Sequence, residues 1–166
     1  MHPTPRGPRL ASADEYLACT DRALLGMRDL VAALGDEFAN DRPGLPGANS
    51  PYALLTHCLG VVDYWCGALV AGRPVDRDRD AEFRATGPVA PLLARVDAVR
   101  ARLADDVRAA DPGAPLHEPP PAEYLGPEGI STRGAALLHV LEELVQHHGQ
   151  LQVLRDALVA AGEVRA

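Results

Sequence analysis

The sequence predicts an all-α protein, a four-helix bundle, from three observations. Apolar residues recur at helical spacing in four long segments, over about residues 12–36, 51–71, 88–109 and 132–161. Hydrophobic residues make up 47% of the chain but aromatic residues only 4%, which favours an aliphatic helical core over a sheet. Segments rich in proline, glycine or charge separate the four helices. We expect a single domain over residues 1–166, with an ordered core over about residues 12–162.

The first helix is predicted from a capping signal followed by an apolar stripe. In the stretch SADE, Ser12 can cap the helix while Glu15 reaches back to the cap. The apolar positions that follow at helical spacing are Leu17, Leu24, Met27, Leu30, Val31 and Leu34. The loop NDRPGLPGAN, rich in proline and glycine, ends this helix.

The second helix should be the most buried of the four. Ser50 can cap it, and Pro51 suits the first helical position. The stretch YALLTHCLGVVDYWCGALVAG is apolar nearly all round, which is typical of a helix in the core. Gly72 then ends the helix, and Pro74 prevents it from restarting. The charged stretch RPVDRDRDAEFRATG is expected to cross the surface in solvent.

The third and fourth helices are also amphipathic. The third carries one apolar stripe with arginine and aspartate between its members, which are Val89, Leu92, Val96, Val99, Leu103 and Val107. The fourth ends at Gly162. The connections before and after the third helix are long enough to run the length of a bundle, so a simple up-down-up-down order is not required.

Charge and cysteine content exclude several classes of protein. The net charge is −7 and no basic cluster stands out, so we expect no nucleic-acid partner. No apolar run approaches the roughly 20 residues that cross a bilayer, and the first ten residues lack the apolar core of a signal peptide. We therefore expect a cytoplasmic protein with no membrane partner. The chain has three cysteines, Cys19, Cys58 and Cys66, and none of them forms a CxxC motif. They should be free thiols.

Titratable residues gather in HVLEELVQHHGQ, residues 139–150. On a helical wheel of about 100° per residue, Glu143 lies about 40° from His147, and both fall within the apolar stripe. Glu142 lies about 140° away, on the solvent side. His139 and His148 lie on opposite flanks. One glutamate and one histidine of the fourth helix are therefore predicted to point inward.

A third such residue is predicted on the second helix. His57 shares its face with Ala53, Leu54, Val61, Tyr64 and Ala68. A carboxylate in an aliphatic core costs on the order of several kcal/mol unless a group compensates it. A divalent metal would compensate Glu143, and two histidines with one glutamate match a catalytic zinc site with an open position. The small residues Ala53, Gly60 and Ala68 would leave space beside such a metal.

Plainer interpretations exist for these residues. Glu143 and His147 could simply pair along one helix, and His57 joins them only if its helix is adjacent. Trp65 and Tyr64 are expected in the core rather than at a cofactor. The run DRDRD is expected to be a solvated loop, although its arginines could bind an anionic or sugar-bearing ligand.

Two segments resemble the DinB-like superfamily, in particular its branch of mycothiol transferases and proteins like the N-terminal part of mycothiol-dependent maleylpyruvate isomerases. They are NSPYALLTHCLGVVDYW and LLHVLEELVQHHGQLQVLRD. The resemblance implies a four-helix bundle with a non-sequential helix order and long crossover loops, often dimeric. It also implies a metal site formed by His57, Glu143 and His147. Some relatives carry a further histidine where this chain has Gln150, so the resemblance implies an open metal position here.

The resemblance further implies a metal-dependent thiol S-transferase. A metal-bound thiolate, most simply from mycothiol with zinc, would attack an electrophilic small molecule. All 16 basic residues are arginine and isoleucine occurs once, as in a high-GC bacterium that makes mycothiol. Arg79 and Arg84 are the candidates for binding the thiol cosubstrate. Two alternatives stay open: a non-catalytic metal- or ligand-binding dimer, and a mycothiol-dependent isomerase, whose relatives usually carry a further C-terminal domain.

Overall fold

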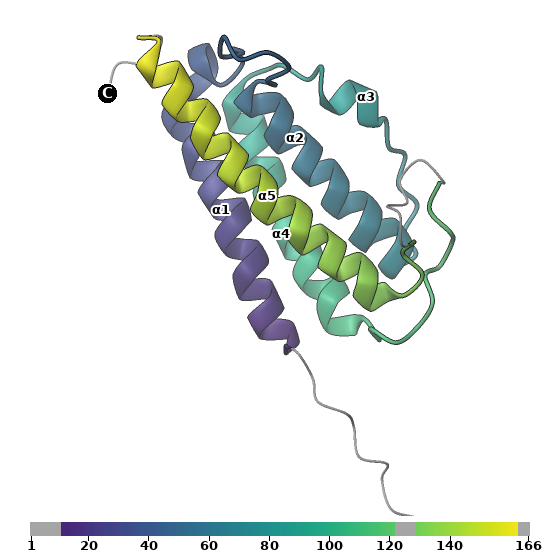
Figure 1. Ribbon diagram of the computed structural model, residues 1–166. Coiled ribbons are helices and arrows are strands. Elements are labelled where there is room, and N and C mark those ends of the chain that lie inside the picture. The colour runs from purple at the N-terminus through teal and green to yellow at the C-terminus, as the bar shows by residue number, and fades with distance from the viewer. Residues whose placement is uncertain (1–10, 122–128, 163–166) are drawn as a thin grey trace, which may run out of the picture.

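The computed structural model describes residues 11–121 and 129–162, and these form a bundle of long helices (Figure 1). The helices are α1 (Ala13–Phe38), α2 (Pro51–Val62), α3 (Arg79–Glu82), α4 (Val89–Ala109) and α5 (Arg133–Ala160). A π-helix, η1 (Asp63–Val70), continues α2. The described residues contain no strand, so the all-α prediction is confirmed, and each long helix ends within two residues of its predicted bounds.

Side-chain caps fix the beginnings of three of the long helices. The capping box at α1 is present, because the backbone N–H of Glu15 donates to Ser12 Oγ (3.2 Å) and that of Ser12 donates to Glu15 Oε2 (2.7 Å). Ser50 caps α2 through the N–H of Ala53, as the sequence predicts. Thr132 caps α5 in the same way.

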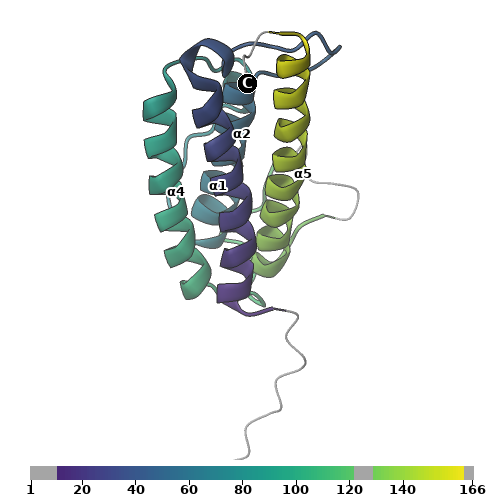
Figure 2. The same cartoon turned by 90° about the vertical axis from the view of Figure 1, so that its left-hand side faces the viewer.

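The helices pack in a non-sequential order. α1 packs between α4 and α5, and the continuous α2–η1 helix packs between the same two on the other side (Figure 2). The phenol of Tyr16 donates to the carbonyl of Leu137 (2.7 Å), so α1 and α5 start at the same end and run parallel. Arg100 near the middle of α4 pairs with Asp21 early in α1 (2.8 Å), which fits antiparallel packing of these two. The predicted order with long crossovers is thereby confirmed.

The α2–η1 helix supplies most of the core, and its length corrects one expectation. The segment Pro51–Val70 has 20 residues, long and apolar enough by composition to cross a membrane, so the statement that no run approaches that length was wrong. Its burial explains its composition, because 89% of the apolar window is buried by the other helices. A core helix that contacts neighbours on every side has no polar face to display.

The π-helix changes which residues face α5. Each residue of a π-helix turns the chain less than a residue of an α-helix does, because its hydrogen bonds close wider rings. A straight α-helical wheel places Tyr64 and Ala68 beside His57, with Trp65 further round. In the structure the ring of Trp65 instead meets that of His139 on α5, with 4.5 Å between centroids. The smaller turn per residue in η1 brings Trp65 closer to the face of His57 than a straight α-helix would.

The charged stretch after η1 also departs from prediction. It was expected to cross the surface in solvent, yet it carries α3, which Asp78 caps and which packs against α2. The side chains of Arg77 and Glu82 are only 6% and 9% exposed. The prediction of a solvated loop is wrong at these two residues, because Arg77 and Glu82 pair with each other and Glu82 also contacts the side chain of His57.

Candidate metal centre

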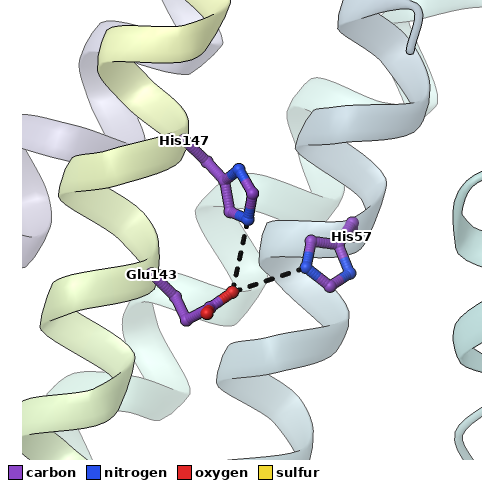
Figure 3. A group of neighbouring side chains, drawn as sticks. All are labelled: His57, Glu143 and His147. Atoms are coloured by element: carbon purple, nitrogen blue, oxygen red, sulfur yellow. Dashed lines mark ion pairs between the residues drawn. The ribbon is translucent and has the colours of Figure 1, made fainter. Parts of the chain in front are cut away.

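Three side chains from two helices meet at one carboxylate oxygen (Figure 3). Oε2 of Glu143 lies 3.5 Å from Nε2 of His57 and 3.3 Å from Nε2 of His147. One ligand atom from each residue lies within 4.8 Å of the other two. Glu143 and His147 sit one turn apart on α5, and His57 faces them from α2. The packing of α2 against α5, which the family resemblance implies, brings the three together.

The three residues differ in their exposure. The His57 side chain is 3% exposed, whereas those of Glu143 and His147 are 24% and 18% exposed. His57 therefore anchors the site in the core, and the two α5 residues border the solvent side. This geometry leaves the group accessible to a small molecule.

Each histidine has its other ring nitrogen held by a different side chain. Nδ1 of His57 lies 2.9 Å from Oε2 of Glu82, and Nδ1 of His147 lies 2.9 Å from Oε1 of Gln150. A carboxylate or an amide oxygen can only accept a hydrogen bond, so both Nδ1 atoms carry hydrogens and donate them. Nε2 of each ring is then the nitrogen directed at Glu143. Outer partners of this kind orient metal-binding histidines in general.

Glu82 is itself held by Arg77. Nε and Nη2 of Arg77 donate to Oε1 and Oε2 of Glu82, at 2.8 and 3.0 Å, in a bidentate pair. Burial alone would raise the pKa of the Glu82 carboxyl, but hydrogen bonds from His57 and Arg77 outweigh it and hold that pKa below its usual range. Glu82 is therefore an anion at neutral pH, matched by one cation.

The pKa values within the triad show how it stabilises itself without a metal. Hydrogen bonds from His147 and His57 outweigh burial and hold the pKa of the Glu143 carboxyl far below its usual range. Burial lowers the pKa of His147, but hydrogen bonds to Glu143 and Gln150 outweigh it, and the pKa is raised. The imidazolium form of His147, paired with Glu143, therefore persists to higher pH than that of an ordinary histidine, and the contact along the helix that the sequence allows is present.

The donor set fits a divalent metal. Two imidazole nitrogens and one carboxylate oxygen are ligands that zinc prefers, and sites with three protein ligands keep a position for water or substrate. The convergence of both Nε2 atoms on one carboxylate oxygen sets this group apart from a simple helical pair. His57, Glu143 and His147 would hold the metal, while Glu82 and Gln150 would orient the rings.

A cavity of about 230 Å³ opens beside the triad. Its lining consists of His57, Val61, Trp65, Arg77, Arg79, His139 and Glu143. Trp65 and His139 form an aromatic wall, and the guanidinium of Arg79 lies over the ring of Phe83, 5.2 Å from its centroid. The cavity therefore joins two candidate metal ligands to an aromatic side and a basic side.

The other residues singled out from the sequence take varied places. Arg79 lines the cavity, whereas Arg84 is exposed and is not among the lining residues. Glu142 is exposed, as the helical wheel predicts. His139 and His148 take opposite flanks: His139 meets Trp65, and His148 packs against Gly26 of α1.

The space expected beside small residues of α2 is used differently. Gly60 was expected to leave room beside a metal, but a Cβ built on Gly60 would lie 1.9 Å from Oε1 of Glu82. Ala53 and Ala68 are buried and do not line the 230 Å³ cavity. The prediction was wrong for this cavity, because the side chain of Glu82 fills the volume next to Gly60.

Sequence reasoning missed Arg77 and Glu82. Both lie in a stretch rich in charged residues, where the sequence does not distinguish a buried charged residue from a solvated one. One signal was present: Phe83 is the only aromatic residue between Trp65 and Tyr124. Its ring stacks on that of His57, with centroids 4.3 Å apart and planes 28° apart. A lone aromatic in a charged stretch indicates that the segment folds back onto the core.

Comparison with known proteins gives a family and a fold. A sequence model of the DinB superfamily matches residues 20–151. The match covers most of the chain and includes His57, Glu143 and His147. A crystal structure of the conserved protein of locus from Enterococcus faecalis is similar, with a TM-score of 0.70 and 15% identity, covering 92% of this chain and 99% of that one. At this identity the likeness shows the fold alone. Among curated proteins, none matches this chain.

Proposed function

The chain belongs to the DinB superfamily, and we propose that it is a metal-dependent thiol S-transferase whose thiol is of the mycothiol type. One observation carries the proposal: both histidine Nε2 atoms face the same oxygen of Glu143, while both Nδ1 atoms are held by other side chains. A purely structural pair on α5 needs neither His57 nor the orientation that Glu82 imposes on it.

Charge favours an anionic fourth partner. With two neutral imidazoles and one carboxylate, a divalent cation leaves the site with one net positive charge, and a thiolate would neutralise it. A divalent metal held by the triad, zinc by preference, would lower the pKa of a thiol so that its sulfur is anionic at neutral pH. Arg77 and Glu82 neutralise one another and leave this balance unchanged.

The residues around the triad would position the two reactants. Trp65 and His139 shield one side of the cavity from water, and Arg79 offers a positive charge on the other. The sulfur forms a bond to the electrophilic carbon, and the bond from that carbon to its leaving group breaks, with its electron pair going to the leaving group. The thiol proton passes to solvent. Holding sulfur and carbon together in one small cavity supplies the rate advantage of proximity.

Two alternatives make different predictions. An isomerase would regenerate its thiol in each turnover, whereas a transferase consumes one thiol per product. A non-catalytic binding dimer would be favoured by large apolar side chains exposed on the first or third long helix. Among the described residues, such side chains are Leu45, Leu138, Val145 and Val153, on a loop and on α5. This arrangement does not favour the binding protein.

The experiment is a thiol panel with the purified, zinc-supplemented protein. Mycothiol, glutathione and cysteine are each offered with monochlorobimane, and the fluorescent thioether and remaining thiol are measured. Mycothiol should react at least about tenfold faster than glutathione, a preference of roughly 1.4 kcal/mol, with one thiol consumed per product. Equal rates with all thiols, or background rates with each, would contradict the proposed transferase activity. The variant Glu142→Gln should keep the rate, since its exposed side chain lies outside the triad.

Cytoplasmic location and a homodimer complete the proposal. The burial of the α2–η1 helix in the bundle is that of the core of a soluble protein, which supports the first. Leu138, Val145 and Val153 are exposed along α5, which supports self-association. Light scattering of the purified protein tests the homodimer by its mass.

A further inference from the structure

We propose that Glu82 is a positioning residue which fixes the orientation of the His57 ring and thereby sets the affinity of the site for zinc, with Arg77 holding Glu82 in place and Gly60 providing its space. The inference rests on the proposed metal site. It assigns a role to the charged stretch between η1 and α4, which contributes no candidate ligand of its own.

The ring of His57 is fixed in two ways. Phe83 stacks on its face, with ring centroids 4.3 Å apart, which sets the plane of the ring. Stacking alone leaves the ring free to rotate by about 180° about its Cβ–Cγ bond, which keeps the plane but exchanges Nδ1 with a carbon. Glu82 removes this freedom, because its Oε2 accepts the Nδ1 hydrogen at 2.9 Å and would face a C–H in the other orientation. Only the observed orientation directs Nε2 at Glu143.

Arg77 keeps the carboxylate of Glu82 on His57. A second cavity, of about 330 Å³, is lined by Glu82 of α3 and Gly60 of α2. The carboxylate of Glu82 therefore has room to move away from His57. Two hydrogen bonds from Arg77, at 2.8 and 3.0 Å, hold both oxygens in their places. Oε2 thereby serves His57 and Arg77 together, and Oε1 serves Arg77.

Gly60 is the condition for this arrangement. It lies on α2 almost one turn after His57, directly under the carboxylate of Glu82. A Cβ at position 60 would lie 1.9 Å from Oε1 and 2.5 Å from Cδ of Glu82, far inside contact distance. Any side chain there must displace the carboxylate from His57. The adjoining cavity can receive the displaced group, so the protein should still fold.

The consequence for zinc follows from the geometry of the ring nitrogen. Binding requires an Nε2 lone pair that points at the metal, which requires the hydrogen to stay on Nδ1. Loss of a partner that enforces this orientation typically weakens metal binding by about 10- to 100-fold. Glu82 should therefore control affinity although no atom of it lies in the triad.

The first test is Glu82→Gln against Asp80→Asn. The amide keeps the size of Glu82, but in either orientation its NH2 meets a donor of Arg77, so Arg77 can no longer hold the group against His57. Asp80 is exposed on the same short helix. Competition with a chelator should show zinc binding at least about tenfold weaker in Glu82→Gln and unchanged in Asp80→Asn. Proton–nitrogen NMR of the imidazole rings in the metal-free protein should show the Nδ1–H of His57 bonded to Glu82, and this signal should be lost only in Glu82→Gln.

The second test approaches the same contact from α2. Gly60→Ala should weaken zinc binding about as much as Glu82→Gln does, and the double variant should be no worse than either single one. Variants that act through one contact are non-additive in this way. Additive losses would overturn the role assigned to Gly60. Gly60→Ala also keeps the proposal testable if Glu82→Gln proves unstable.

The outcomes separate this inference from the proposed function. Wild-type protein that takes up no zinc would sink the metal site, yet the NMR signal of His57 would still report whether Glu82 fixes its ring. Wild-type protein that binds zinc, with a Glu82→Gln variant that binds it equally well and keeps the Nδ1–H form of His57, would overturn the role of Glu82 alone. Equal weakening by Asp80→Asn would overturn it too.

Discussion

Gln150 meets His147 on the side of the ring that faces away from Glu143. Its Oε1 lies 2.9 Å from Nδ1 of His147, whereas Oε2 of Glu143 lies 3.3 Å from Nε2. The resemblance described above raises the question of a fourth metal ligand at position 150. In this chain the amide of Gln150 orients the His147 ring through Nδ1, on the side away from Glu143. It therefore leaves a position for a fourth ligand at a metal held by the triad.

Gln150→Ala should therefore weaken zinc binding by less than about tenfold, since one exposed neutral hydrogen bond contributes roughly 0.5–1.5 kcal/mol. Gln152→Ala, which changes an exposed residue of the same helix, should have no effect. Chelator competition measures both. A loss as large as that of a triad variant would mean that Gln150 is itself a ligand.

Two adjacent glutamates give the sharpest contrast on α5. Glu143→Gln should weaken zinc binding more than about 100-fold and abolish thiol transfer, because a neutral amide replaces the anionic ligand. Glu142→Gln should change neither, since position 142 faces solvent. Metal content and conjugation rate are measured on both. The reverse pattern would show that the register of α5 has been misassigned.

His57→Ala should reproduce the loss seen with Glu143→Gln, although it lies on α2. A shared metal is the reason that residues of two helices have the same effect on binding. If Glu143 only paired with His147, removal of His57 would leave that pair intact and change stability alone. Zinc titration and thermal unfolding of the same samples distinguish these cases.

Zinc binding should depend on pH through His147. In the metal-free protein its pKa is raised, so the imidazolium that pairs with Glu143 persists above the ordinary histidine pKa of about 6.5. This ion pair stabilises the metal-free protein fully below about pH 6.5, and that contribution is lost as pH rises through the raised pKa. Zinc needs the neutral ring, so apparent affinity should rise over the same window and then level off. Calorimetry in buffers of different ionisation enthalpy should detect proton release; affinity independent of pH would contradict the assignment.

The two arginines expected to bind the thiol should differ. Arg79→Ala should raise the KM for mycothiol several-fold with little change in kcat, because Arg79 lines the cavity beside the triad. Arg84→Ala should have a smaller effect, since Arg84 is exposed and outside that lining. Steady-state kinetics with mycothiol varied decide between them. Equal effects would place the sugar-binding surface further along the charged stretch.

The bundle was predictable because its signals are local. The caps Ser12 and Ser50 and the 3.6-residue apolar period define helices within the sequence itself. The triad was predictable for the same reason: a helical wheel places Glu143 and His147 on one face, and only the pairing of α2 with α5 was missing. The resemblance supplied that pairing.

The support of the triad was not predictable from local signals. Glu82 and Arg77 are buried by contacts with a helix that precedes them in the chain, and a charge run does not reveal such contacts. The π-helix was also missed, because apolar periodicity cannot distinguish a widened turn from a regular one in a helix buried all round. Both features decide how His57 and Trp65 face the cavity.

The central claim is that His57, Glu143 and His147 hold one divalent metal, and elemental analysis of the purified protein tests it most directly. Protein expressed with zinc in the medium and purified without chelators should contain about one zinc per chain. The same preparation of His57→Ala should contain almost none, although it folds. Wild-type protein without metal that also takes up none from a zinc solution would contradict the account.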